Sequence, residues 1–143
     1  MYEVVVGIDF GSSGIGYAFS FNNKEDIIIG KFPDQGIDAK IPTQIILDSN
    51  KKTLAFGAEC KKYIGDNGLK YSDLYFKKIK MNLYENKDYI IPENSSKEYP
   101  IDDIIAKVLE NVKKKAIITI QEYNPKIKED KIKWVVTVPA IWK

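Results

Sequence analysis

The chain has 143 residues, 44% hydrophobic and 29% charged, a composition that argues against disorder and allows one buried core. It has no histidine and all 22 basic residues are lysine, which excludes imidazole bases, histidine metal ligands and arginine fingers within the chain. The net charge of +2 argues against nucleic-acid binding. No apolar run approaches the ~20 residues of a membrane span and no secretory leader precedes the first strand, so we expect a cytoplasmic protein.

The first 31 residues predict a three-stranded meander. The continuous apolar run Val4–Asp9 is typical of a buried central strand. A glycine-serine loop follows, and residues 17–21 alternate as a returning strand would. Residues 26–30 supply the third strand after an asparagine-rich turn.

The middle of the chain predicts short elements. Residues 32–41 are rich in glycine and proline and indicate a connection. The expected elements after it are strands at 43–47 and 53–56, one or two helical turns at 57–64, a segment of helix-like spacing at 72–83, and a loop or short edge hairpin at 86–99. Cys60, the single cysteine, is expected to be buried as a small apolar group.

A long helix and a final strand complete the pattern. Apolar residues recur every three or four positions from Ile101 to Ile120, with Asp102 and Asp103 in the first turn. Residues 134–138 then predict another buried strand, which Pro139 stops. Strands, an insertion, a helix and a last strand parallel to the first make an α/β arrangement.

The loop after Asp9 has the composition of a phosphate-binding turn. The P-loop and Rossmann glycine patterns do not fit this loop. The letters DFG at Asp9 also occur in protein kinases, but a kinase needs its lysine strand and catalytic loop before that motif, and only eight residues precede Asp9. Glycines and serines at 11–14 would let phosphate oxygens approach the backbone amides. A bare carboxylate would repel such a ligand unless Mg²⁺ lay between them. The alternative that Asp9 and the serines only cap a tight turn stays open.

Two motifs carry a resemblance to a known family. The stretch "GIDFGSS" with its returning strand resembles the first phosphate motif of the actin, sugar kinase and 70-kDa heat-shock protein superfamily. The stretch "VVTVPAIW", after a long helix, is similar to a strand of the 70-kDa heat-shock proteins. The segments "FGAECKKYI" and "FKKIKMNL" are most similar to the divergent 12A-like branch of that family.

The resemblance implies a fold and its division. The fold would be ribonuclease H-like (actin-like ATPase) of class α/β, with this chain as a partial first lobe that carries an inserted small α+β subdomain. The core subdomain would comprise residues 1–40 and 100–143, and the insertion residues 41–99. The chain would then be the amino-terminal portion of an ATP-binding, ATP-hydrolysing chaperone-like protein, with ATP or ADP and Mg²⁺ as cofactors.

The resemblance also implies roles for single residues. Asp9 would orient hydrated Mg²⁺ and the attacking water, while Gly11, Ser12, Ser13 and Gly14 would hold the β- and γ-phosphates. A lysine from the insertion would stabilise charge on the γ-phosphate. Lys80 is the favoured candidate and Lys78 the alternative, and either would otherwise be a surface lysine. Pro139 matches a proline that links nucleotide state to a substrate-binding domain, although a strand terminator fits equally well.

Several expectations limit this reading. The family's second phosphate loop and opposing lobe have no counterpart in these residues, so we expect the chain alone to bind ATP weakly or not at all and not to hydrolyse it. Two alternatives remain, namely a non-hydrolysing nucleotide-sensing or protein-interaction module of the same fold, and the first lobe of a sugar or acid kinase. Client or signalling proteins are the implied partners, besides the nucleotide.

Overall fold

The computed structural model describes residues 1–11, 14–32 and 40–137, without the side chains of residues 83 and 84. The described residues form two compact units, and each is treated separately below. Residues 1–41 and 111–137 belong to the first unit, and residues 42–110 to the second. The helix α3 (Ile101–Tyr123) begins in the second unit and ends in the first. Whether these units are the core and inserted subdomains of an actin-like fold stays a prediction.

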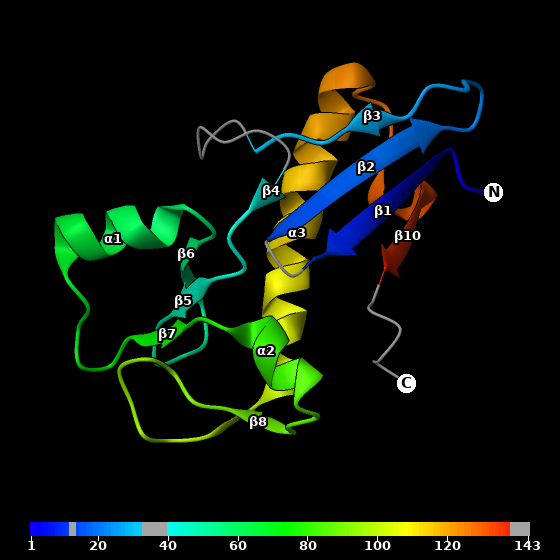
Figure 1. The fold of residues 1–143 in the computed structure, drawn as a ribbon. Coiled ribbons are helices and arrows are strands. Elements are labelled where there is room, and N and C mark those ends of the chain that lie inside the picture. The colour runs from blue at the N-terminus through cyan, green and yellow to red at the C-terminus, as the bar shows by residue number, and fades with distance from the viewer. Residues whose placement is uncertain (12–13, 33–39, 138–143) are drawn as a thin grey trace. The chain divides into compact units, whose positions relative to one another are not determined.

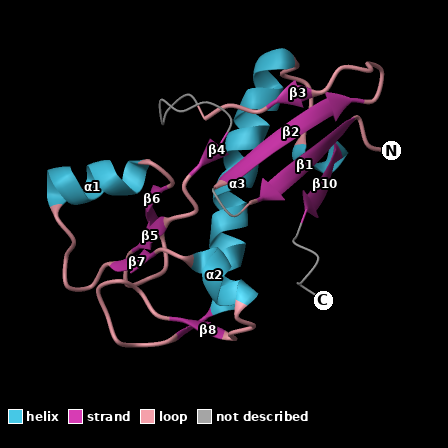
Figure 2. Ribbon diagram, in the orientation of Figure 1, coloured by secondary structure: helices cyan, strands magenta, loops and turns pink. Residues whose placement is uncertain are grey.

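The first unit is built on one sheet, which contains the expected meander (Figures 1 and 2). Its strand order is β10-β1-β2-β3, and a short strand β4 also pairs with β2. The meander is antiparallel throughout, whereas β10 runs parallel to β1, as the sequence predicts. The bounds of these strands are β1 Val4–Phe10, β2 Ile15–Phe21, β3 Ile28–Ile29, β4 Lys40–Ile41 and β10 Ile132–Thr137, the last preceded by a 3-10 turn at Glu129–Lys131.

The carboxyl-terminal half of α3 covers one face of this sheet (Figure 1). Phe19 and Phe21 of β2 both contact the ring of Tyr123, with centroid distances of 5.7 and 6.3 Å. The Tyr17 hydroxyl lies 2.7 Å from the Thr119 hydroxyl and donates to the carbonyl of Lys31 at 2.8 Å. These contacts join the last turns of α3 to the aromatic side chains of β2, and the apolar residues that recur along the helix, among them Val112, Ala116 and Ile120, are buried.

The expectation that β1 is buried on both faces is wrong for the described residues. Burial alternates along the strand, so Val6 and Ile8 are buried while Val5 and Asp9 are exposed. The strand β10, also expected to be buried, is exposed along most of its length. A continuous run of β-branched residues therefore reflects strand propensity here, because within the described residues α3 covers only one face of the sheet.

The second unit contains a small sheet and two short helices. Its strand order is β6-β5-β7, all antiparallel, from β5 Ile45–Leu47, β6 Thr53–Phe56 and β7 Leu74–Phe76. The helices are α1 Glu59–Asn67, which ends at Gly68 with a positive φ of 69°, and α2 Ile79–Tyr84. A two-stranded pair, β8 Tyr89–Ile90 with β9 Tyr99–Pro100, forms the hairpin-like segment that the sequence predicts as one alternative.

The segment 72–83 is where sequence periodicity misleads. Its apolar residues have helix-like spacing, but Leu74–Phe76 is a strand and only Ile79–Tyr84 is helical. Tyr75 and Phe76 are buried because the strand pairs with β5, Phe76 opposite Ile45. A strand of three residues is too short to show an alternating pattern, and its partner Ile45 lies 31 residues away from Phe76 in the sequence.

Candidate functional site

The candidate site lies at the carboxyl end of β1. Because β1 and β10 are parallel, their carboxyl ends meet at one edge of the sheet, with Asp9 opposite Thr137. Ligands of open α/β sheets bind at the carboxyl ends of parallel strands. Asp9 follows the buried Ile8, so its side chain projects from the opposite, exposed face of the sheet. Its place near the end of β1 puts the carboxylate at the edge where ligands are commonly bound.

Two glycines shape the turn that follows Asp9. A Cβ at Gly14, whose φ is 154°, would lie 2.5 Å from the carbonyl oxygen of Ile41, a backbone atom. A Cβ at Gly11 would lie 2.9 Å from the carbonyl oxygen of Gly14 and 3.3 Å from Nζ of Lys40. Any other residue at position 14 would push β4 away. Glycine at positions 11 and 14 therefore allows β4 and its Lys40 to lie beside the turn.

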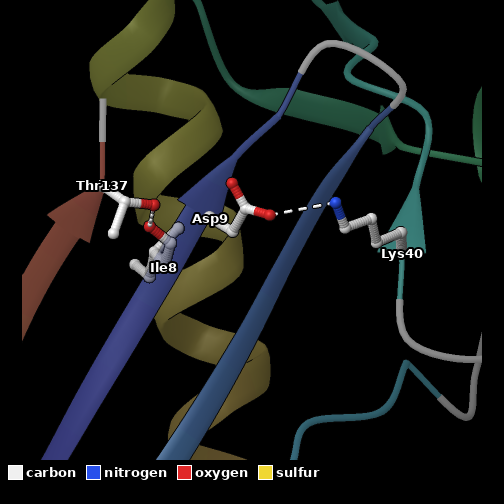
Figure 3. A network of polar contacts seen from close by, with 4 residues as sticks. All are labelled: Ile8, Asp9, Lys40 and Thr137. Carbon is white, nitrogen blue, oxygen red and sulfur yellow. Dashed lines mark hydrogen bonds and ion pairs between the residues drawn. The ribbon is translucent and has the colours of Figure 1, made fainter. Parts of the chain in front are cut away.

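The carboxylate of Asp9 forms an ion pair across the sheet (Figure 3). Nζ of Lys40 lies 2.9 Å from Oδ2 of Asp9, and both side chains are about half exposed, 47% and 55% respectively. On the other side of Asp9, the hydroxyl of Thr137 donates to the carbonyl of Ile8 at 3.1 Å and so fastens the ends of β10 and β1 together. A carboxylate held on a rigid strand, open to solvent and paired with a cation, can exchange that cation for another.

The structure brings together part of the predicted site. Asp9, Gly11 and Gly14 lie at one hairpin of the first unit. Ser12, Ser13 and Pro139 lie outside the described residues. Their predicted roles, phosphate binding for the serines and a switch for the proline, stay predictions.

The predicted phosphate lysines belong to the second unit. Lys80 lies in α2 and is partly buried. Lys78 directly precedes that helix, is exposed, and has a positive φ of 51°. Its carbonyl accepts a hydrogen bond from the side-chain amide of Asn82 at 2.9 Å. The assignment of either lysine to a phosphate stays a prediction.

Sequence reasoning missed Lys40. Residues 32–41 read as a connection, but Lys40–Ile41 is a strand that pairs with β2. Its register places Lys40 opposite Gly16, which in turn lies opposite Asp9, so the three residues form one row across the sheet. A two-residue strand has no periodicity to detect, and only the long-range register reveals that Lys40 reaches the site.

The donor set of this site fits a magnesium ion that is shared with phosphate. No group of three or more acidic or cysteine side chains that could hold a metal occurs among the described residues. Asp9 therefore offers one carboxylate, and its pairing with an ammonium shows that this position accepts positive charge. Mg²⁺ is commonly held by one or two carboxylates, substrate phosphates and water. Because Gly11 has no side chain, the backbone of the turn can approach to within van der Waals distance of this carboxylate, since a Cβ there would lie 3.6 Å from Oδ1 of Asp9.

The fold and this hairpin fit a broad class of protein. The chain is mixed α/β, with a meander, then a helix, then a last strand parallel to the first. This arrangement is consistent with an actin-like fold in general. No protein-family model matches the sequence. Within the described residues, no helix has both the length and the apolar character that a bilayer crossing requires.

Curated relatives match nearly the whole length of the chain. Over 99% of its length the chain is 32% identical to heat shock 70 kDa protein 12B of Homo sapiens, and 31% identical to heat shock 70 kDa protein 12A of the same species. It is 30% identical to heat shock 70 kDa protein 12A of Mus musculus. These matches support an Hsp70-like branch as the family of this chain, in agreement with the motifs at its two ends. The chain spans only 22–23% of the length of these relatives.

Proposed function

We propose that the chain supplies the first phosphate-binding hairpin of a magnesium-dependent ATP site in an Hsp70-like, ATP-hydrolysing, chaperone-like protein. The observation that carries the proposal is the half-exposed carboxylate of Asp9, at the carboxyl edge of parallel strands and beside a glycine-shaped turn. The Hsp70-like relatives support nucleotide and Mg²⁺ as the ligands of such a site.

The residues of the chain would divide the work. Asp9 would hold the ion, directly or through its waters, and Gly11 and Gly14 would allow phosphate oxygens close to the backbone. When bound, Mg²⁺ supplies positive charge that offsets the negative charge of the phosphate oxygens. The hydrogen bond from Thr137 to Ile8 keeps the two strand ends in register, so that the carboxylate has a fixed position. A preorganised carboxylate lowers the reorganisation required during phosphoryl transfer.

The test is nucleotide binding by isothermal titration calorimetry on the full-length protein, with ADP and ATP, in Mg²⁺ and in excess EDTA. We expect Mg²⁺-dependent binding that Asp9→Asn weakens at least tenfold, about 1.4 kcal/mol. Asp130→Asn, which makes the same change at an exposed acid of the 3-10 turn before β10, is the matched control and should bind like the parent. Binding that is absent from the parent, or equal in the parent and Asp9→Asn, would overturn the proposal.

Hydrolysis needs a separate measurement. Phosphate release from ATP by the full-length protein, compared with Asp9→Asn and Lys80→Gln, separates an enzyme from a nucleotide sensor. We expect release by the parent and its loss in both variants. Binding without release would instead favour the non-hydrolysing alternative, and a Lys80→Gln variant as active as the parent would remove that lysine from the site.

A further inference from the structure

The position of Lys40 is the feature that the proposed function leaves unexplained. Asp9, Gly16 and Lys40 form one row across β1, β2 and β4, and paired residues of neighbouring strands share a face. Glycine in the middle of the row leaves no side chain between the outer two. The lysine therefore extends across β2, and its ammonium meets the carboxylate at 2.9 Å (Figure 3).

Stability alone gives little reason for this pair. Ion pairs between exposed side chains contribute little to stability, and both partners here are about half exposed. The pair also lies where a ligand would be: Nζ of Lys40 is 3.3 Å from the point that a Cβ of Gly11 would occupy, at the start of the turn. An ammonium has three donors, so a single carboxylate does not exhaust its capacity.

We propose that Lys40 is a ligand-binding residue of this site: it contacts the polyphosphate when ligand is present and neutralises Asp9 when it is not. The inference rests on the proposed function. Without ligand, the charges of Lys40 and Asp9 cancel, so a metal ion that arrives alone competes with an ammonium already in place. With a polyphosphate, the same ammonium has anionic oxygens to bind, and the carboxylate is released to the metal.

Two binding constants should therefore change in opposite directions when the charge of Lys40 is removed. In the full-length protein, we expect Lys40→Gln to weaken Mg²⁺-ADP binding at least tenfold by calorimetry. The same variant should bind Mn²⁺ alone about three- to tenfold more tightly, measured from the loss of the free-ion signal in electron paramagnetic resonance. Lys40→Arg keeps the charge and should stay within a few-fold of the parent in both measurements.

A matched control is available on the same sheet. Lys133 of β10 is exposed and lies opposite Val5, four residues before the Asp9–Thr137 pair, so Lys133→Gln changes the net charge equally without touching the site. This variant should match the parent for both ligands. Far-ultraviolet circular dichroism of each variant checks that the fold is retained, and Asp9→Asn should lose most of its Mn²⁺ binding.

The outcomes separate the two proposals. If the parent binds Mg²⁺-ADP and Asp9→Asn does not, while Lys40→Gln equals the parent, the role of Lys40 is refuted and the phosphate hairpin stands. If Lys40→Gln weakens the binding of Mn²⁺ and of Mg²⁺-ADP alike, the lysine only positions Asp9 and the inference is wrong. If the parent binds no Mg²⁺-ADP, the proposed function fails, and the role of Lys40 fails with it.

Discussion

Two hairpins of this chain carry an aspartate where their first strand ends, and they use it differently. Asp48 follows β5, and its Oδ1 accepts hydrogen bonds from the backbone N–H groups of Asn50 at 2.8 Å and Lys52 at 2.9 Å. It is a turn cap, satisfied by its own loop. Asp9, near the end of β1, is paired with the side chain of Lys40, which belongs to another strand.

The difference teaches what to look for in an acidic residue beside a turn. An aspartate that binds neighbouring amides has its acceptors occupied by the fold itself, and a ligand would have to break the turn to reach it. An aspartate whose partner is an exposed ammonium has a partner that another cation can replace. The hairpin of β5 and β6, which carries Asp48 and is called the second hairpin below, is therefore structural. The hairpin of β1 and β2, which carries Asp9 and is called the first hairpin, is able to bind a ligand. Four experiments can break or sharpen this comparison.

The largest expected effect is on the rate at which the thiol of Cys60 reacts, which tests whether the second hairpin stays folded over it. Cys60 is fully buried against Ile46 and Ala55 of that hairpin. Burial, with a smaller contribution from the charge of Glu59, raises the pKa of its thiol to about 12. At pH 8 only about 1 in 10⁴ of such thiols is ionised, against roughly a quarter of ordinary ones, and the thiolate is the reactive form.

A thiol reagent at pH 8 should therefore modify Cys60 at least about 10³-fold more slowly in the folded protein than in the urea-unfolded protein. The single cysteine makes the unfolded chain its own control. Rates within tenfold of each other would mean that the hairpin opens readily, and the description of a closed structural hairpin would be wrong.

Gly14→Ala should be the most damaging substitution at the first hairpin. The new Cβ would lie 2.5 Å from a backbone oxygen of β4, at a φ that favours glycine, so we expect a loss of about 2–3 kcal/mol in the free energy of unfolding. Denaturant unfolding followed by circular dichroism measures this. Gly7→Ala in β1 is the matched control, because nothing lies within 4 Å of its Cβ, and it should change stability by less than about 0.5 kcal/mol. Equal stabilities would mean that β4 does not approach the turn closely.

These elements also show how far sequence reasoning reaches. Local patterns were sufficient for the meander, the long helix and the parallel last strand, because propensity and periodicity over many residues agree with the final fold. They failed for Leu74–Phe76 and for Lys40–Ile41, whose strand state depends on partners far along the chain. The site divides in the same way: the composition of the loop points to Asp9, but only strand register brings in Lys40.

Asp48→Ala should have a smaller effect than Gly14→Ala. It removes the acceptor of two exposed amide hydrogen bonds, so the free energy of unfolding should fall by about 1 kcal/mol, while binding of Mg²⁺-ADP stays unchanged. Asp48→Asn keeps an Oδ1 acceptor and should lose less, which denaturant titrations of the two variants can resolve. An asparagine variant as unstable as the alanine variant would mean that the charge of Asp48, and not its hydrogen bonds, stabilises this turn.

The smallest expected effect is that of Asp9→Asn on the free energy of unfolding. It decides whether Asp9 is a ligand-binding residue or a structural one like Asp48. If the Asp9–Lys40 pair is a replaceable surface pair, its loss should lower the free energy of unfolding by less than about 1 kcal/mol. The coupling in a double-mutant cycle with Lys40→Gln should be similarly small and should shrink in 1 M salt, because exposed charges are screened. A stability loss larger than that of Asp48→Ala would make Asp9 a structural residue. Any loss of nucleotide binding in Asp9→Asn would then report a damaged hairpin instead of a missing ligand.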